Sequence, residues 1–398
     1  QTFSILARAT LATLPNIMPR EPLVLLLILT TLRLGAAASK PNIAQEGKLL
    51  LLRHCPRVPF TNDRHPPLAP GNYSNADNFS SRSFPSTAKW QVAQGQCTPA
   101  GVQLARQMGA ALPSVLGTSR TLRVLADQQQ RCQDTAAALG LNLTAVEVNQ
   151  ALFDPLSALK GCKQPAWQQT VERQVARLEP ELKEARMLLK ELQELLGKGV
   201  APPLQDIPDN VSNGYLVGGL RVASEVIMET FMLERMSALP VAWDQLSDAG
   251  LQRLMQLRDA YFPAMYGGFD IAQRYGSGVL AELMSLDVSQ TTSVLVGHDT
   301  SLQAIQSLLG LGWQCGPWTK GSVEPLLGIL FTASEGKMSV QSVCPTLNSE
   351  APFAVGSASF AGGKSELPIT DFKSLVRPAI AWQCVNTSDA GKERQVIV

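Results

Sequence analysis

Two histidines in this chain stand where short apolar runs end, and each has charged neighbours. The first run, residues 49–52, is followed by Arg53 and His54, and Arg57 comes three residues later. Positive charge of this density at the end of a buried strand is costly unless an anion lies against it. The planar fork of arginine matches the oxygens of a phosphate group, so the pattern favours a phosphate-binding site.

A second run far downstream has the same layout. The stretch 294–297 is followed by His298 and Asp299, and a third apolar stretch, 123–126, is followed at a short distance by Arg131. Ligands of open α/β sheets bind at the carboxyl ends of the strands. We therefore expect these polar groups to converge.

Together, these residue types could hydrolyse a phosphomonoester. Arginines neutralise the equatorial oxygens of the transferred group. A neutral imidazole such as that of His54 can attack phosphorus and form a phosphohistidine, which water later opens. Asp299 is a candidate acid for the leaving alcohol, and the helix expected to start near Ser301 adds partial positive charge.

The elements that must position these groups predict an α/β fold with a helical insertion. Three buried strands are expected, at 48–52, 123–126 and 292–296. Helices are expected after the strands, at 99–112 with Thr98 as the N-cap, 128–139 and 301–309. Between the second and third strands, residues 154–284 are predominantly helical, with further helices at 220–236 and 248–262. A hairpin of strands at 326–331 and 338–343 and a helix at 369–376 complete the prediction.

Two further stretches are predicted to have irregular or interrupted secondary structure. Residues 59–96 lack a helical or strand period and are predicted to be a long loop. An apolar stripe runs from 171 to 196, and Pro180 should kink or split its helix. The stripe favours packing against the parent domain, with a coiled-coil dimer as the alternative.

Composition sets limits on function and compartment. The chain has 398 residues, of which 45% are hydrophobic and 17% charged, and its net charge is +1, so nothing global favours nucleic acid or an anionic membrane. Seven cysteines fit an oxidising compartment, and the odd number leaves at least one without an intramolecular partner.

The N-terminal region has the pattern of a secretory signal peptide. Arg20 precedes the apolar stretch 23–29, and small residues at 36–38 precede Ser39. An anchor helix or a buried segment is the alternative, although the stretch is shorter than the ~20 residues of a membrane span. Five sequons fit a secreted glycoprotein: Asn72, Asn78, Asn142, Asn210 and Asn386.

From about residue 48 to residue 384, the chain resembles the histidine acid phosphatases, branch two of the histidine phosphatase superfamily. Within this family it is most similar to the bacterial periplasmic phytase and glucose-1-phosphatase type. The resemblance rests on five motifs in order: Arg53-His54-x-x-Arg57-x-Pro59, Cys97-Thr98-Pro99-x-Gly101, Ala126-Asp127-x-x-x-Arg131, Phe153-Asp154-Pro155-Leu156 and Gly297-His298-Asp299-Thr300.

This resemblance implies a site and a fold. His54 would be the nucleophile, Asp299 the proton donor, and Glu229 a residue of the substrate cleft. Four residues would bind the transferred phosphoryl group: Arg53, Arg57, Arg131 and His298. The family needs no metal or cofactor. Its fold is an α/β domain with a mixed sheet and a smaller α-helical domain.

The resemblance and the element order together divide the chain. Residues 1–38 are the upstream segment and signal peptide, 39–150 and 285–390 the α/β domain, 151–284 the α-helical domain, and 391–398 a tail. By resemblance, Cys162 and Cys384 would form a disulfide between the helical domain and the C-terminus. Cys315 and Cys344 are a second candidate pair because both flank the same region.

One departure from the family pattern concerns catalysis. The residue after His54 is Cys55 instead of glycine, and Pro56 follows. A glycine that requires positive φ could not be replaced without distortion, whereas extended backbone accepts cysteine. A phosphate-binding protein with impaired catalysis is therefore the alternative function. As a free thiol beside arginines, Cys55 should have a depressed pKa and oxidise readily.

The other single residues favour plainer roles. Cys97 and Cys132 are expected to be buried thiols, and His65 to be solvated. We expect a small phosphorylated substrate, no nucleic acid and no membrane anchor after signal cleavage, in a secreted, periplasmic or lysosome-like location. Phytate, a sugar phosphate and a broad range of esters stay open as substrates, as does the oligomeric state. A phosphate-transferring mutase is less favoured, because such enzymes are usually intracellular.

Overall fold

The computed structural model describes residues 46–60, 75–117, 122–141, 146–163, 165–289, 291–316, 318, 320–347 and 350–385. Contacts divide the chain after residue 44, and residues 45–398 form one compact unit. The expected signal peptide, the C-terminal tail and His65 lie outside the described residues. Within these ranges no helix combines the length and apolar character needed to cross a membrane.

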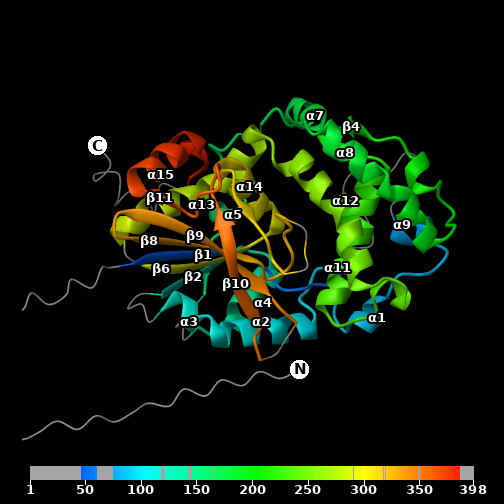
Figure 1. Cartoon of the computed structure of the whole chain (residues 1–398), viewed down its shortest axis with the longest axis horizontal. Coiled ribbons are helices and arrows are strands. Elements are labelled where there is room, and N and C mark those ends of the chain that lie inside the picture. Colours follow the sequence, from blue (N-terminus) through cyan, green and yellow to red (C-terminus); the bar gives the residue numbers. More distant parts are fainter. Residues whose placement is uncertain are drawn as a thin grey trace, which may run out of the picture. The chain divides into compact units, whose positions relative to one another are not determined.

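Among the described residues, nine strands form one mixed sheet (Figure 1). Its strands run in the order β3 (Glu147–Val148), β2 (Leu122–Ala126), β6 (Thr292–Gly297), β1 (Gly47–Arg53), β8 (Gly328–Ser334), β9 (Lys337–Pro345), β10 (Phe353–Ser359) and β7 (Gly312–Trp313), with β11 (Glu366–Pro368) beside β9. This architecture confirms the predicted α/β fold with a mixed sheet.

The three predicted strands lie next to one another at the centre of the sheet. β1 and β2 both pair in parallel with β6, while β1 pairs antiparallel with β8 on its other side. Leucines 49 to 52 are all buried, as expected for a strand covered on both faces. Parallel pairing brings the carboxyl ends of β1, β2 and β6 to one edge of the sheet.

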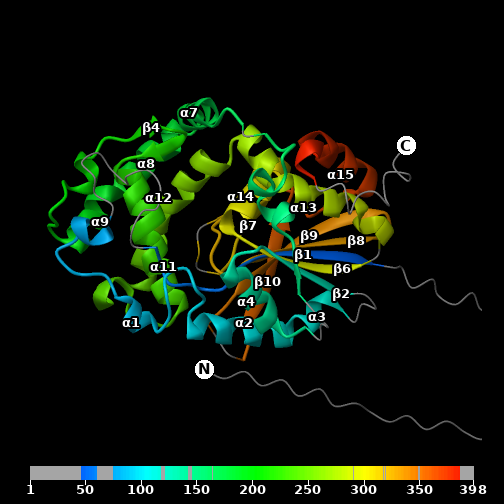
Figure 2. The same cartoon turned by 180° about the vertical axis from the view of Figure 1, so that it is seen from behind.

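Helices cover both faces of the sheet (Figures 1 and 2). On one face lie α2 (Pro99–Ala111), α3 (Pro113–Leu116) and α4 (Gln130–Leu139), and on the other α13 (Phe269–Ser289), α14 (Asp299–Leu309) and α15 (Ile369–Val376). The side chain of Thr98 accepts a hydrogen bond from the Gly101 amide, which makes Thr98 the predicted N-cap of α2.

A second group of helices lies beside the sheet. It comprises α7 (Trp167–Arg177), α8 (Glu179–Arg186), α9 (Leu188–Leu196), α10 (Gly219–Arg221), the π-helical turn η3 (Val222–Met228), α11 (Glu229–Met236) and α12 (Asp248–Tyr266). Its short elements are η2 (Leu204–Asp206), η4 (Val241–Asp244), and the hairpin of β4 (Asn210–Ser212) and β5 (Tyr215–Val217). The short helices α5 (Gln150–Phe153) and α6 (Pro155–Ala158) pack instead on α13. The predicted domain boundaries at residues 150 and 284 stay predictions.

The apolar stripe between residues 171 and 196 packs within the chain. Pro180 lies in the first turn of α8, where it separates α8 from α7, so the expected split occurs. Val171, Leu182 and Leu192 are fully buried in the main core. The packing interpretation is therefore confirmed.

One local prediction needs correction, and one long helix was not predicted individually. The region 59–96 is not entirely loop, because it contains η1 (Ala76–Phe79) and α1 (Thr87–Trp90). These are single turns, too short to produce a hydrophobic period in the sequence. The sequence also gave no specific prediction for α13, although its 21 residues pack on β1 and β8. The C-terminal turns η5 (Arg377–Ala379) and η6 (Trp382–Cys384) follow α15.

Candidate active site

The carboxyl ends of three strands bring the predicted polar residues together. The His54 amide donates to the Gly297 carbonyl (3.0 Å), and the Asp127 amide donates to the Val296 carbonyl (3.1 Å). These bonds hold the ends of β1, β2 and β6 at the same level. The rings of His54 and His298 lie 5.4 Å apart in an edge-to-face arrangement. The two histidine motifs, separated by more than 240 residues, therefore form one site.

The imidazole of His54 is buried and held in one orientation. Its Nδ1 lies 2.8 Å from the carbonyl oxygen of Cys55, so Nδ1–H donates and Nε2 keeps its lone pair. Burial lowers the pKa of His54 well below its ordinary value, and the charges of Arg131 and Arg53 lower it further. A neutral imidazole with a free Nε2 has the chemical form of a nucleophile at acidic pH.

Three arginines surround this imidazole, and each has a donor that no described residue accepts from. The Nε atoms of Arg53, Arg57 and Arg131 are buried, and none has a hydrogen-bond partner among the described residues. Burial lowers the pKa of Arg57 to about 10, with the charges of Arg131 and Arg53 adding to the effect. Buried donors without partners are rare in folded proteins. An oxyanion in this cup would supply the missing acceptors.

Glu229 forms ion pairs with two of these arginines. It is 4% exposed and is the first residue of α11, directly after the π-helical turn η3. Its Oε1 accepts hydrogen bonds from Arg53 Nη2 (2.7 Å) and Arg57 Nη2 (3.1 Å). Burial raises the pKa of Glu229, but the three neighbouring arginines outweigh it and hold the pKa below its ordinary value. The expectation that Glu229 contacts a substrate stays a prediction.

The third of these neighbours, Arg258, is a site residue that sequence reasoning missed. It is 1% exposed and lies on α12. Its Nε donates to Glu229 Oε2 (3.0 Å), and its Nη2 donates to Asp299 Oδ2 (2.8 Å). Its guanidinium also stacks over the ring of Phe262, 3.8 Å from the centroid. An arginine on the apolar stripe of a helix was the available signal, because Leu254 precedes it by four positions.

Asp299 is clamped by two arginines. Besides Arg258, it contacts Arg53 Nη2 at 3.0 Å. Burial raises the pKa of Asp299, but Arg53 and Arg258 lower it more, so the net pKa is far below the ordinary value. The carboxyl is therefore ionised in the protein without ligand. A proton-donor role requires a bound group that weakens this clamp.

His298 is oriented from two sides. Its Nε2–H donates to Asp127 Oδ2 (2.8 Å), and Arg131 Nη2 lies 3.4 Å from its Nδ1. Burial raises the pKa of Asp127, but the hydrogen bond and charge of His298 outweigh it and lower the pKa below its ordinary value. Gly297 permits this packing, since a Cβ there would lie 2.6 Å from the Phe153 ring.

Cys55 does not carry the reactive thiol that the sequence suggested. It forms a disulfide with Cys97, 42 residues away, which also corrects the expectation that Cys97 is a free thiol. Cys55 is not among the residues with positive φ, so its backbone accepts a side chain. The disulfide ties the segment after the nucleophile to the start of α2, where the Thr98 amide donates to the Pro56 carbonyl (2.9 Å).

The remaining cysteines behave largely as expected. The structure joins Cys162 to Cys384 and Cys315 to Cys344, the two pairs that the sequence analysis named. Cys132 is free and buried. Disulfides of this kind persist in oxidising compartments.

Glu324 is a second buried residue that sequence reasoning did not assign to the site. It precedes β8 and is fully buried, and neither carboxylate oxygen has a hydrogen-bond partner among the described residues. Its neighbour Val323 accepts a hydrogen bond from Arg53 through its carbonyl. Burial raises the pKa of Glu324 to about 8, and Asp259 adds to the rise.

This chain is similar to known proteins in its fold. No protein-family model matches it, and no curated protein sequence matches it. Its architecture is an α/β domain with a mixed sheet and an attached group of helices, the fold of the bacterial phytases. This agrees with the sequence resemblance to histidine acid phosphatases.

Three solved phytase structures illustrate the likeness. The phytase from Citrobacter braakii is 18% identical, with a TM-score of 0.70 over 85% of this chain and 98% of that chain. The Hafnia alvei phytase in complex with myo-inositol hexakis sulphate is 21% identical, with a TM-score of 0.69 over 85% and 98%. The phytase from Klebsiella sp ASR1 is 17% identical, with a TM-score of 0.69 over 86% and 96%. At these identities the likeness establishes the fold.

Proposed function

We propose that this chain hydrolyses phosphomonoesters by transferring the phosphoryl group first to His54 and then to water. The observation that carries the proposal is the set of three buried arginines whose Nε atoms have no partner among the described residues and which surround one neutral imidazole. Phosphoryl oxygens are the acceptors that this arrangement of donors fits best. Arg53, Arg57, Arg131 and His298 would bind the transferred group.

The covalent step follows from the orientation of His54. Its Nε2 lone pair attacks phosphorus in line with the leaving oxygen, the P–O bond breaks, and its electron pair stays on that oxygen. The leaving oxygen takes a proton from Asp299. The negative phosphoryl group competes for Arg53 and repels the Asp299 carboxylate, so binding raises the pKa of Asp299 and permits protonation. Water then attacks phosphorus and gives its proton to the Asp299 carboxylate, and the P–N bond breaks, which releases phosphate and His54.

We propose a small phosphorylated substrate and a secreted or periplasmic location. The three disulfides support such a compartment. Inositol hexakisphosphate is a candidate because neighbours in fold are phytases, one of them in complex with myo-inositol hexakis sulphate. A sugar phosphate or a broad range of esters fits the same cup.

The alternative function, a phosphate-binding protein with impaired catalysis, has one observation in its favour. Asp299 is ionised in the protein without ligand because Arg53 and Arg258 clamp it. The original reason for the alternative is weaker, since Cys55 adopts backbone that accepts a side chain. The two functions differ in whether a covalent phosphoenzyme forms.

Trapping the phosphoenzyme tests the proposal. At pH ~4–5 the lowered pKa keeps His54 neutral, and a bound phosphoryl group raises the pKa of Asp299 toward protonation. Mixing the protein with an aryl phosphate at this pH should release a burst of phenol equal to the protein concentration. Quenching in base and mass spectrometry should locate the phosphoryl group on His54. His54→Ala should lose the burst and at least ~10³-fold in turnover while keeping its melting temperature.

A panel of inositol hexakisphosphate, glucose 1-phosphate and the aryl phosphate would then define the substrate range. Binding of inorganic phosphate without release from any ester would contradict hydrolysis and support the binding function. A burst that survives in His54→Ala would place the nucleophile elsewhere.

A further inference from the structure

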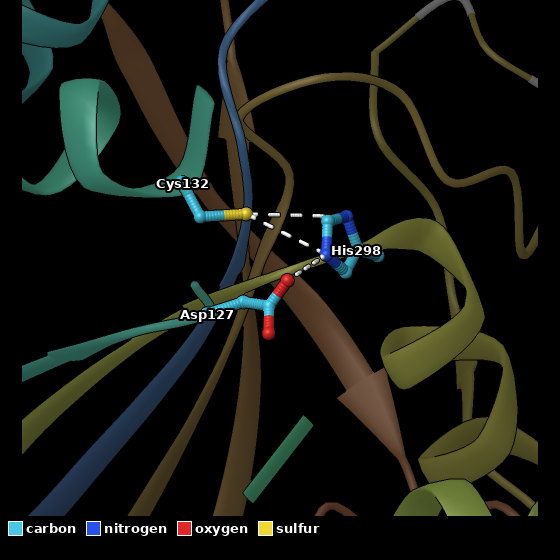
Figure 3. Close-up of side chains that lie close together, drawn as sticks. All are labelled: Asp127, Cys132 and His298. Atoms are coloured by element: carbon cyan, nitrogen blue, oxygen red, sulfur yellow. Dashed lines mark hydrogen bonds and ion pairs between the residues drawn. The ribbon is translucent and has the colours of Figure 1, made fainter. Parts of the chain in front are cut away.

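Asp127, Cys132 and His298 form a compact cluster at one side of the arginine cup. They come from the end of β2, from α4 and from the residue before α14, and Figure 3 shows their side chains pointing toward one another. His298 Nε2 lies 2.8 Å from Asp127 Oδ2 and 3.7 Å from Cys132 Sγ. One ligand atom from each residue lies within 4.8 Å of the other two.

The chemistry of this cluster matches a borderline-soft divalent cation. A thiolate, an imidazole and a carboxylate are all zinc ligands, whereas magnesium and calcium prefer oxygen alone. Zinc bonds of about 2.0–2.3 Å in tetrahedral geometry separate the ligand atoms by about 3.3–3.8 Å. The three side chains therefore need only small shifts to reach these separations.

Two of these ligands are already away from solvent, and burial also raises the pKa of the Cys132 thiol, so zinc has to displace that proton. Cys132 and Asp127 are 0% and 1% exposed, so neither ligand would have to be taken from water when an ion binds. Zinc would displace the thiol proton to solvent, and two anionic ligands would balance its charge. The neighbouring Arg131 would then face a neutral complex. The proposed phosphoryl chemistry gives Cys132 no role.

We propose that Asp127, Cys132 and His298 bind one Zn²⁺ ion, with a water molecule in the fourth position, and that this ion inhibits phosphoryl transfer. Zinc on Nε2 of His298 leaves the ring proton on Nδ1. That N–H would then face the Nη2 donor of Arg131, which now lies 3.4 Å away. Two donors repel, so Arg131 turns away from the phosphoryl group.

The two halves of this inference are tested separately. Zinc binding depends only on the cluster, whereas inhibition rests on the proposed phosphatase function. A protein without phosphatase activity would still bind zinc, so failure of the proposed function and failure of the zinc site give different results.

The binding test compares the metal-free full chain with variants of Cys132. Zinc is titrated against a chromophoric chelator, and Co²⁺ serves as the spectroscopic probe. The wild type should bind one ion and show a thiolate-to-cobalt charge-transfer band. Cys132→Ser should lose the band and bind Zn²⁺ about 100-fold more weakly. Cys132→Ala is a second variant, which keeps the site apolar if serine disturbs folding.

Asp134→Asn is the matched control. Asp134 lies on α4 two residues from Cys132, and its carboxylate accepts from Gln130 outside the cluster. Its removal should leave zinc affinity unchanged. Equal zinc affinity in the wild type and both Cys132 variants would overturn the site. Binding of Mg²⁺ as tight as that of Zn²⁺ would overturn it too, because a thiolate site discriminates against magnesium.

The activity test uses an aryl phosphate, because inositol hexakisphosphate would itself chelate zinc. Each variant is compared with its own metal-free rate. Zinc should inhibit the wild type at the concentration that fills the site, and Cys132→Ser should need about 100-fold more. Equal inhibition of both proteins would mean that zinc acts elsewhere and would overturn the inhibitory role.

Discussion

The sheet edge and the helices of the candidate site differ in how fully their charged groups are paired. The sheet edge and the adjoining α4 provide His54 and arginines such as Arg131, whose hydrogen-bonding capacity is partly unused. The helices α11 and α12 provide Glu229 and Arg258, which are buried and bound to each other. The sheet-edge arginines therefore keep Nε donors for a ligand, whereas Glu229 and Arg258 are bound to each other.

This difference explains how the cup can exist without a ligand. Several guanidinium groups in one buried space repel one another unless counter-charge lies among them. Glu229 supplies that charge and holds Arg53 and Arg57 in place before any anion binds. Preorganised donors of this kind stabilise a transition state without reorganising during the reaction. The helices thus determine the geometry in which the sheet edge reacts.

Glu229→Gln should produce the largest effect on this arrangement. The substitution removes the counter-charge from Arg53, Arg57 and Arg258 and leaves the site with buried positive charge. We expect the free energy of unfolding to fall by about 3–5 kcal/mol. Added inorganic phosphate should restore part of the loss, because an anion replaces the missing charge. Urea unfolding with and without phosphate measures both effects.

Glu234→Gln is the control for this experiment. Glu234 is also buried on α11, but its Oε2 accepts from the Ala242 amide (2.9 Å), and burial raises its pKa to about 7. A neutral glutamine keeps this acceptor, so its stability at pH 7 should stay within about 1 kcal/mol of the wild type. Similar losses in both variants would show that burial, and not the arginine cluster, makes Glu229 important.

The sheet side of the site could be predicted from the sequence. Short apolar runs that stop at polar residues indicate strand ends, and parallel pairing brings such ends together. His54, Arg131 and Asp299 each follow a strand of this kind by a few residues. These residues could therefore be placed from local sequence patterns together with one rule, that parallel strands bring their carboxyl ends to the same edge of a sheet.

The helical side could not be predicted in the same way. Arg258 has its role because α12 packs where Glu229 and Asp299 both reach it, and no local pattern encodes that packing. The Cys55–Cys97 disulfide was missed for a related reason, since seven cysteines allow many pairings. The disulfide 162–384 was expected only through resemblance to a family.

Glu324→Gln tests how a buried carboxyl without a partner among the described residues differs from the paired carboxylate of Glu229. The folded-state pKa of Glu324 is raised to about 8 from an ordinary value of 4.5, so the folded protein holds a proton that the unfolded chain has lost. Stability is therefore full below pH 4.5 and falls as the pH rises toward 8. The variant stays neutral and should be roughly 4 kcal/mol more stable than the wild type at pH 8, because each unit of the pKa shift corresponds to about 1.4 kcal/mol.

The difference between the two proteins should shrink to near zero by pH 4.5. Urea unfolding at several pH values measures it, with Glu194→Gln on the exposed face of α9 as the control. If the wild type and Glu324→Gln lost stability equally between pH 5 and 8, Glu324 would have to be paired and ionised in the folded protein.

Arg258→Met should have the smallest effect, but it separates the two sides of the site most cleanly. Methionine keeps the packing on Phe262 and removes one of the cations that hold the pKa of Asp299 low. Because Asp299 must be protonated to donate, each pH unit above its pKa reduces the competent fraction of free enzyme tenfold. Removing an adjacent cation raises a carboxyl pKa by roughly one unit or more.

The descending limb of the kcat/KM profile should therefore move upward by about one pH unit, a gain of about tenfold for alkyl phosphates. Aryl phosphates should gain less, because phenolate leaves without a proton. Arg258→Lys keeps the positive charge and should leave the limb near its wild-type position. A higher KM with an unchanged limb would instead assign Arg258 to substrate binding. The helical side would then contact the ester directly, and the division between reacting and positioning groups would fail at this residue.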